Sequence, residues 1–272
     1  MQKSLFFIIS LLFFSCTRES KTLSIVDGKK LINYVNPFIG TGGHGHTYPG
    51  ATMPFGMMQL SPDTRLEGWD GCSGYHYSDA YIYGFSHTHL SGTGVSDYGD
   101  ILLMPTNTIN FHNGADGKKG YRAHFSHKNE EASPGYYHVK LDSTEIDVKL
   151  TVSKRSGIHK YQFPKSTNQI VILDLQHRDK VLDATIEKIS NTQLQGYRFS
   201  DAWAKDQRLY FYIKTSHAFK DSLQPSVNGG STKRKTALTF INPKNEPIII
   251  NIGISPVDDA GARQNLETEI GS

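Results

Sequence analysis

The segment IDVKLTV, from Ile146 to Val152, decides the fold class of this chain. Its apolar residues alternate with polar ones, which is the two-residue period of a β-strand with one buried face. Strand-length segments recur downstream between turn signals, and helical periodicity is nearly absent before residue 258. The sequence therefore predicts an all-β fold, a two-sheet antiparallel β-sandwich. The other strand segments are Ile170–Leu175, Leu209–Lys214, Ala237–Ile241 and Pro247–Ile254, and the turn signals are Ser133–Gly135, Asn228–Gly230 and Asn242–Pro243.

Length and composition are those of a globular protein. The chain has 272 residues, of which 37% are hydrophobic, so it can bury a sizeable core as one large all-β domain. Its formal charge of +3 is spread along the sequence without a run of like charges. A nucleic-acid partner is therefore not predicted.

The N-terminus has the layout of an export signal. Lys3 precedes the apolar run Leu5–Phe14, which is too short to cross a bilayer, and Cys16 follows shortly after it. This arrangement is similar to a bacterial lipoprotein signal, so we expect a signal peptide over residues 1–16 and lipidation of Cys16. Residues 17–30 then form a polar tether. The protein is predicted to be exported and anchored by lipid to a membrane, in the periplasm or at the outer cell surface. The alternative is an ordinary secretory peptide.

Only two cysteines are present. If Cys16 carries lipid, Cys72 has no partner within the chain, so no disulfide framework is available and the fold must rest on its apolar core. Cys72 is then either a small buried residue or a thiol that lines a cleft.

The C-terminus predicts a short helix. Asp258 can cap a helix that runs through Ala262 and Leu266 to Ile270. We interpret residues 258–272 as the start of a linker helix, which ends before it has anything to pack on.

Between Asn33 and Pro105 the sequence is rich in glycine, histidine and aromatic residues. Thirteen of the 25 glycines fall between Gly40 and Gly99. Glycine allows a backbone to turn at positive φ or to approach a ligand closely. This glycine-rich block, residues 33–105, is therefore predicted to form a shaped binding surface.

Two His-x-His pairs occur in the glycine-rich block, His44 with His46 and His87 with His89. On a strand each pair would place both imidazoles on one face, and two pairs could form a transition-metal site. The block shows no clear pattern for a third ligand. Structural hydrogen bonding or contact with a sugar is therefore the preferred interpretation, and no metal ligand is assigned.

Trp69 lies between glycines, in Gly68-Trp-Asp-Gly71. Such glycines weaken strand pairing on both sides, which argues against an ordinary core position. An indole can cover the apolar face of a pyranose while Asp70 accepts hydrogen bonds from ring hydroxyls. The alternative is a buried aromatic ring that holds a long loop in place.

No catalytic residue can be assigned from the sequence. Glycoside hydrolysis usually needs two carboxyl groups on either side of the bond, and nothing selects a pair among the acidic residues of the block. The common nucleophile, metalloprotease and phosphate-loop motifs are absent. The acidic residues considered are Asp63, Glu67, Asp70, Asp79, Asp97 and Asp100.

Four segments carry a family resemblance. They are YVNPFIGTGGHGHTYPGATMPFGMMQLSPDTR at 34–65, GWDGCSGYHYSD at 68–79, GFSHTHLSGTG at 84–94 and DYGDILLMP at 97–105. The chain resembles the N-terminal domain of the α-mannosidases of glycoside hydrolase family 92, which are abundant in Bacteroides and its relatives. The resemblance covers residues 31 to about 270.

The resemblance implies a β-sandwich domain over residues 31–257, followed in the family by a linker and a large (α/α)₆ barrel. Calcium-dependent, inverting hydrolysis of terminal mannose in that family uses an acid and a base from the barrel. Trp69 matches a tryptophan that contacts sugar. By the same match, the sites at or near the domain interface are Asp70, Cys72, His44 and His46, with His87 and His89 as further substrate-binding candidates. Leu66 and Glu67 depart from the family pattern before the Gly-Trp-Asp motif.

Three hypotheses follow. The first is the sugar-contacting domain of an α-mannosidase, inactive alone and lacking its barrel, which would be supplied in the same or a separate chain. Calcium is then expected for the full-length enzyme and not for this part. The second is a free-standing surface lipoprotein that binds mannose-containing glycans, and the third is a histidine-based metal hydrolase.

Overall fold

The computed structural model describes residues 31–224 and 234–271. The predicted signal peptide with Cys16, the tether and the turn Asn228–Gly230 lie outside the described residues. The chain divides into two units, Met1–Tyr34 and Val35–Ser272. In the described part of the first unit, Ile32–Tyr34 forms a 3₁₀ turn, η1. Within the described ranges, no helix has the length and apolarity needed to span a membrane.

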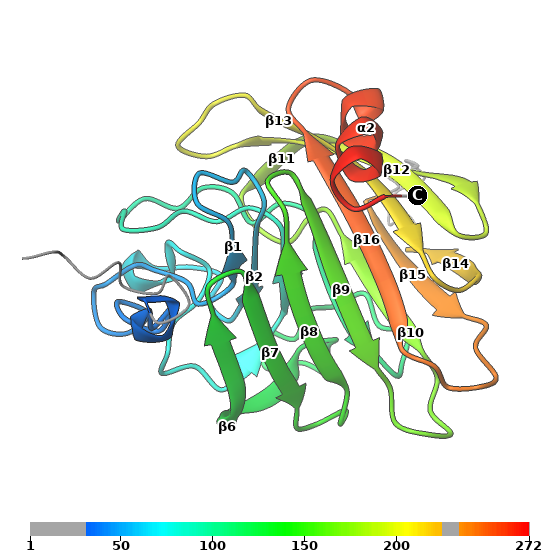
Figure 1. Cartoon of the computed structure of the whole chain (residues 1–272), viewed down its shortest axis with the longest axis horizontal. Helices are drawn as coiled ribbons and strands as arrows, with labels where there is room; N and C mark the ends of the chain where they lie inside the picture. The colour runs from blue at the N-terminus through cyan, green and yellow to red at the C-terminus, as the bar shows by residue number, and fades with distance from the viewer. Residues whose placement is uncertain (1–30, 225–233, 272) are drawn as a thin grey trace, which may run out of the picture. The chain divides into compact units, whose positions relative to one another are not determined.

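The second unit consists of two antiparallel sheets, which confirms the predicted fold class (Figure 1). One sheet has seven strands in the order β1-β2-β4-β5-β10-β15-β14, and the other has nine in the order β11-β12-β13-β16-β9-β8-β7-β6-β3. The strands of the first sheet are β1 (Ala51–Thr52), β2 (Gln59–Asp63), β4 (Gly84–Ser86), β5 (Leu102–Thr106), β10 (Ile170–Asp174), β14 (Phe219–Leu223) and β15 (Lys235–Phe240). Those of the second are β3 (Tyr81–Ile82), β6 (Ala123–Ser133), β7 (Tyr136–Leu141), β8 (Asp147–Val152), β9 (Ser156–Gln162), β11 (Lys180–Ser190), β12 (Gln193–Asp201), β13 (Gln207–Thr215) and β16 (Ile248–Ser255).

The core lies between the sheets and follows the period-two patterns. In β8, Val148 and Leu150 are buried while the residues between them are partly exposed. Every residue of β10 is buried, and β5 and β15 pair with it on its two edges. Ser133–Gly135 separates β6 from β7 as predicted.

The glycine-rich block forms only short strands, joined by long loops. Its strands β1, β2, β4 and β5 build one end of the seven-stranded sheet, and apolar side chains such as Leu60 and Phe85 anchor them in the core. Between these anchors the chain follows an irregular path. The loops therefore lie on a rigid sheet edge, which is where binding residues are commonly placed.

The C-terminal helix α2 (Asp259–Glu269) begins as predicted, since the Asp258 carboxylate accepts a hydrogen bond from the Gly261 N–H at 2.6 Å. The expectation that it has nothing to pack on is wrong. Ala262 and Leu266 are fully buried against Tyr212 of β13. Gly253 of β16 allows this close approach, because a Cβ there would overlap the Ala262 carbonyl.

Replacing Leu266 with alanine should lower the free energy of unfolding by about 2–5 kcal/mol, because it leaves a cavity between α2 and the sheet. The exposed Gln264 of the same helix provides the control, and Gln264→Ala should change stability by less than about 0.5 kcal/mol. Chemical denaturation measures both values. Equal effects of the two substitutions would show that the helix is not docked.

Candidate functional site

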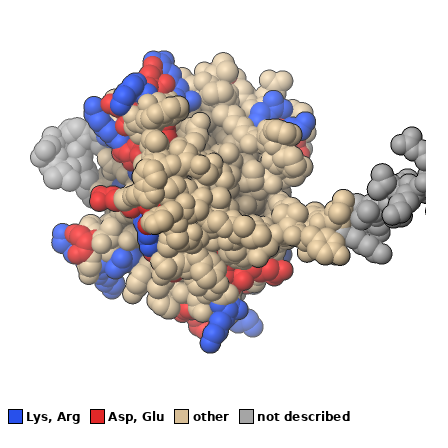
Figure 2. Space-filling model, turned by 90° about the vertical axis from the view of Figure 1, so that its left-hand side faces the viewer, with Lys and Arg blue, Asp and Glu red and all other residues tan. Residues whose placement is uncertain are grey.

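Three segments of the glycine-rich block form one loop face: residues 41–50, residues 68–73 with the 3₁₀ turn η2 (Trp69–Gly71), and residues 90–99. Hydrogen bonds join them, from the Ser73 hydroxyl to the Thr47 carbonyl at 3.1 Å and from the Gly92 N–H to the His46 carbonyl at 2.7 Å. Figure 2 views the molecule from the left-hand side of Figure 1, where the loops around β1 lie. The centre of that view is mostly uncharged, with charged residues nearer the edges.

Trp69 is exposed on this loop face, with 62% of its surface accessible. Gly68 precedes it with φ of 86°, a conformation that favours glycine and turns the chain outward. The far edge of the indole lies against Gly94, where a Cβ would overlap the ring, and the His46 ring meets it edge-on with centroids 5.0 Å apart. The structure therefore contradicts the alternative of a buried aromatic and places the ring as an open platform.

Asp70 follows Trp69 in the turn, and both histidines of the first pair, His44 and His46, approach its carboxylate. The His44 Nδ1–H donates to Asp70 Oδ1 at 2.6 Å, and His46 Nε2 lies 3.5 Å from the same oxygen. The hydrogen bond from His44 is the main cause that lowers the pKa of Asp70. Asp70 is therefore held as a carboxylate, a form suited to accept hydrogen bonds from sugar hydroxyls.

Cys72 lies beneath the turn and is buried. Its Sγ–H donates to the Trp69 carbonyl at 2.8 Å, and burial raises the pKa of the thiol. A neutral, buried thiol holds the turn by its backbone. Of the two interpretations of Cys72, the structure favours the small buried residue over the cleft-lining thiol.

The second histidine pair lies in the interior and diverges. It follows β4 instead of lying on a strand, so its two side chains do not share a face. His87 Nδ1–H donates to the Ile101 carbonyl at 2.5 Å, and its Nε2 lies 2.8 Å from His159 Nε2. Burial favours neutral His87, so with its hydrogen on Nδ1 its Nε2 accepts from His159, whose Nδ1 accepts from the Tyr161 hydroxyl at 2.7 Å. Both imidazoles are neutral in this chain of bonds.

Burial also favours the neutral form of both imidazoles, because it lowers their pKa values. It lowers the pKa of His87 to about 4, against the opposing effect of the hydrogen bond to the Ile101 carbonyl. It also lowers the pKa of His159 well below the usual range. The structure therefore places His87 in the core, away from the loop face.

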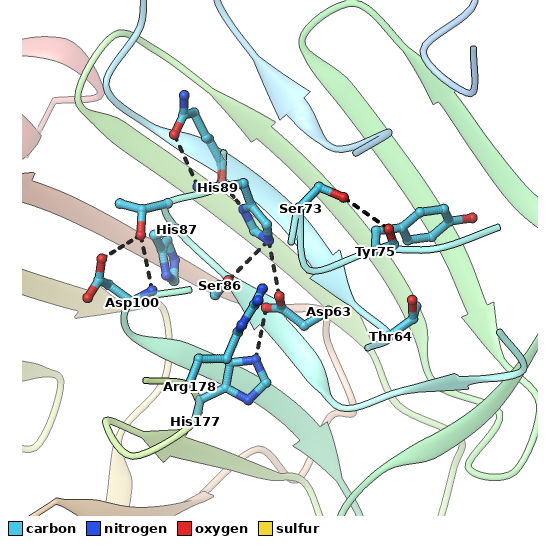
Figure 3. Close-up of polar contacts among 12 residues, drawn as sticks. Asp63, Thr64, Ser73, Tyr75, Ser86, His87, His89, Asp100, His177 and Arg178 are labelled. Atoms are coloured by element: carbon cyan, nitrogen blue, oxygen red, sulfur yellow. Dashed lines mark hydrogen bonds and ion pairs between the residues drawn. The ribbon is translucent and has the colours of Figure 1, made fainter. Parts of the chain in front are cut away.

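His89 belongs to a buried polar cluster around Asp63 (Figure 3). Its Nδ1–H donates to the Gln59 carbonyl at 2.7 Å, and its Nε2 lies 3.3 Å from Asp63 Oδ1. His177 Nε2 lies 3.3 Å from the other oxygen of Asp63. Burial alone would raise the pKa of Asp63, but the charges of His177 and His89 outweigh it and the pKa is lowered. This cluster supports the loop face from below.

Two residues after β10, His177 and Arg178, were not predicted as site residues. His177 faces Asp63, and Arg178 reaches the turn that carries Trp69. A signal was present, because the run His177-Arg178-Asp179-Lys180 follows directly on a buried apolar strand. Polar residues at the end of such a strand are candidates for a buried network.

Most acidic residues of the glycine-rich block are bound to partners within the chain. Asp79 pairs with Arg65 at 2.5 Å, Asp100 pairs with the buried Arg198, and Asp97 accepts from the Ala204 N–H at 2.8 Å. Among residues 31–224 and 234–271, no group of three or more His, Cys, Asp or Glu side chains is placed to hold a metal ion.

Comparison with known families agrees with this architecture. The model of the glycosyl hydrolase family 92 N-terminal domain matches residues 34–255. The chain belongs to this family. The family 92 domain described here therefore carries Trp69 and Asp70 on the loop face of its sandwich.

Known proteins similar to this family 92 domain are much longer. A family GH92 α-mannosidase from Bacteroides thetaiotaomicron is 32% identical, with a TM-score of 0.79, over 88% of this chain and 35% of its own. Its complex with mannoimidazole aligns with a TM-score of 0.78. An uncharacterised secreted glycosidase from Arthroderma benhamiae is 26% identical over 88% of this chain and 35% of its own. The chain thus spans about a third of the length of these relatives.

Replacing His44 with alanine should raise the pKa of Asp70, because it removes the hydrogen bond that stabilises the carboxylate. Carboxyl-carbon NMR followed across acidic pH measures the change. His138→Ala is the matched control, since His138 pairs instead with Asp147. An unchanged Asp70 titration in His44→Ala would show that this contact does not form.

The pKa of His87 predicts how stability depends on pH. The pKa of about 4 in the folded chain is below the usual histidine pKa of 6.5, so the unfolded chain takes up the proton first as pH falls. Stability should therefore decrease from about pH 6.5 toward pH 4, and His87 should contribute about 2 kcal/mol of the loss between pH 7 and pH 5. In His87→Asn the amide can still donate to the Ile101 carbonyl but does not titrate. Urea unfolding at the two pH values should give a smaller loss for this variant, and equal losses would contradict the assignment.

Proposed function

We propose that this chain is the sugar-contacting N-terminal domain of an α-mannosidase, which contacts one side of a terminal mannose in the full-length enzyme and is inactive alone. The observation that carries the proposal is the pairing of the open Trp69 indole with the ionised Asp70 on the loop face. An aromatic face with an adjacent carboxylate suits a pyranose ring. His44 and His46 orient the carboxylate, and Cys72 orients the turn.

Inactivity of the isolated domain follows from the surroundings of its acidic residues. An inverting glycosidase needs a general acid and a general base on opposite sides of the bond, separated by about 6.5–9.5 Å. Asp63, Asp79, Asp97 and Asp100 are bound to internal partners. They are poorly placed for either role, so we assign the acid and the base to the part of the relatives that this chain does not span.

Exposed apolar side chains support a protein partner for this domain. Phe55 is fully exposed and has φ of 58°, which is strained for a residue with a side chain. Met53 and Trp69 are also exposed in the glycine-rich block. Such side chains commonly mark an interface. The proposed partner is an (α/α)₆ catalytic domain, in the same chain or a second one.

We further propose that calcium serves the assembled enzyme and is held outside this domain; in support, no group of three or more His, Cys, Asp or Glu among the described residues is placed to hold a metal ion. Export is supported by the relative from Arthroderma benhamiae, which is named a secreted glycosidase. Lipidation of Cys16 and attachment to a membrane remain proposals from the signal-like N-terminus. Mass spectrometry of the mature N-terminus tests them.

Purified protein incubated with α-1,2- and α-1,3-linked mannobiose and calcium should release no mannose, because we assign the acid and the base to the part of the relatives that this chain does not span. Chromatography of the products measures the outcome. Release that persists after affinity and size-exclusion purification would overturn the proposed inactivity.

The alternative, a free-standing glycan-binding lipoprotein, is tested by calorimetry with mannose oligomers. Saturable heat that is lost in Trp69→Ala and kept in Trp203→Ala would favour this alternative. Trp203 is a suitable control because it is also exposed but lies in the loop between β12 and β13. No saturable heat is expected from a site that lacks its second side.

A further inference from the structure

Arg178 is a buried cation directly beneath the loop face, with 4% of its surface accessible. Its stem passes two glycines at positive φ, Gly74 and Gly99. A Cβ at Gly99 would lie 2.7 Å from Arg178 Cδ, and one at Gly74 would lie 3.1 Å from Arg178 Nη1. The two glycines therefore leave the space that the arginine side chain fills.

The guanidinium group joins two separate loops. Its Nη2 donates to the Gly71 carbonyl at 3.0 Å and to the Ser96 hydroxyl at 2.7 Å. Gly71 is the last residue of the turn η2 that begins with Trp69. Ser96 lies two residues after Gly94, on which the indole edge rests. One side chain thus fixes both the turn that carries the ring and the loop that supports it.

The backbone of Arg178 is fixed as well. Its carbonyl accepts a hydrogen bond from Nη2 of Arg198, whose Nη1 pairs with Asp100. The backbone position from which the Arg178 side chain extends is therefore fixed by a buried hydrogen bond. Both hydrogen bonds come from Nη2, which lies one bond beyond the place of a lysine Nζ, so a lysine at this position would keep the charge but end short of the two acceptors.

We infer that Arg178 is a positioning residue, which sets Trp69 and Asp70 in the orientation that receives the sugar. That the ligand is a sugar rests on the proposed function, whereas the effect of Arg178 on the position of the ring rests on geometry alone. Its hydrogen bonds go to loop residues and none goes to a sheet ladder. Its loss is therefore expected to disturb the platform more than the sandwich.

The test labels the protein with 5-fluorotryptophan and records ¹⁹F NMR spectra without any sugar. The chain has two tryptophans, so Trp69 and Trp203 give two resonances, assigned with Trp69→Phe and Trp203→Phe. Arg178→Lys should shift or broaden the Trp69 resonance by more than its linewidth and affect Trp203 less. Arg122→Lys is the matched control, because Arg122 instead lies over the Tyr81 ring, and it should leave the Trp69 resonance in place.

Ser96→Ala removes one of the two acceptors and should displace the Trp69 resonance in the same direction by a smaller amount. If Arg178→Lys does not fold, Ser96→Ala alone tests whether this hydrogen bond positions the Trp69 ring. An unchanged Trp69 resonance in a folded Arg178→Lys protein, or in Ser96→Ala when the lysine variant is unfolded, would overturn the inference. Because no sugar is present, release of mannose from mannobiose by the domain alone would count against the proposed function and leave this result standing.

Discussion

The fully buried ion pair between Arg198 and Asp100 is the contact on which the loop face depends. Arg198 lies on β12 of the nine-stranded sheet, whereas Asp100 lies just before β5 of the seven-stranded sheet, so the pair joins the two sheets. Arg198 also donates to the carbonyls of Leu175 and Arg178. A buried pair of this kind adds little stability over an apolar pair, but removing one partner costs about 3–5 kcal/mol. Its main effect is to specify one arrangement.

From this pair the polar contacts continue outward to the surface. Asp100 accepts from Thr88, which neighbours His89 and the cluster around Asp63, and Arg198 holds the carbonyl of Arg178. A glycine-rich loop has few side chains with which to fix itself, and its conformational entropy is high. Buried polar side chains supply the missing constraint. Binding residues held in place before the ligand arrives lose less entropy on binding.

The sheets were predictable because their side-chain pattern is local. The alternation around Val148 is contained within one strand and needs no knowledge of its neighbours. The long strand β11, Lys180–Ser190, was not predicted, because it lies at a sheet edge and most of its residues are exposed. The packing of α2 was missed for a related reason. Tyr212 alternates as an outward residue, and only the path of the chain after β16 brings a helix over it.

The loop face was predictable in composition and only partly in geometry. The glycines around Trp69 argued against an ordinary core position but left a buried ring open as an alternative, and only the structure shows that the ring is exposed. The two histidine pairs could not be told apart by spacing, yet His44 and His46 approach Asp70 while His87 and His89 bond separate partners in the interior. The contact of Asp63 with His177 joins residues far apart in sequence. No local pattern encodes such a contact.

In the proposed function, the exposed Trp69 ring contributes to substrate binding and not to the chemical step. Contacts made equally by Trp69 to a bound sugar and to its transition state improve binding without raising the rate of the chemical step. Rate requires groups that act on the charge developing at the bond, and in this domain the buried carboxylates are already bound to cations or to backbone N–H groups. Releasing Asp100 for chemistry would unpair Arg198 and loosen the loops that hold the ring. The same buried charges that give the platform its shape therefore make those carboxylates unsuitable for acid or base work, which favours a division between a positioning domain and a separate catalytic one.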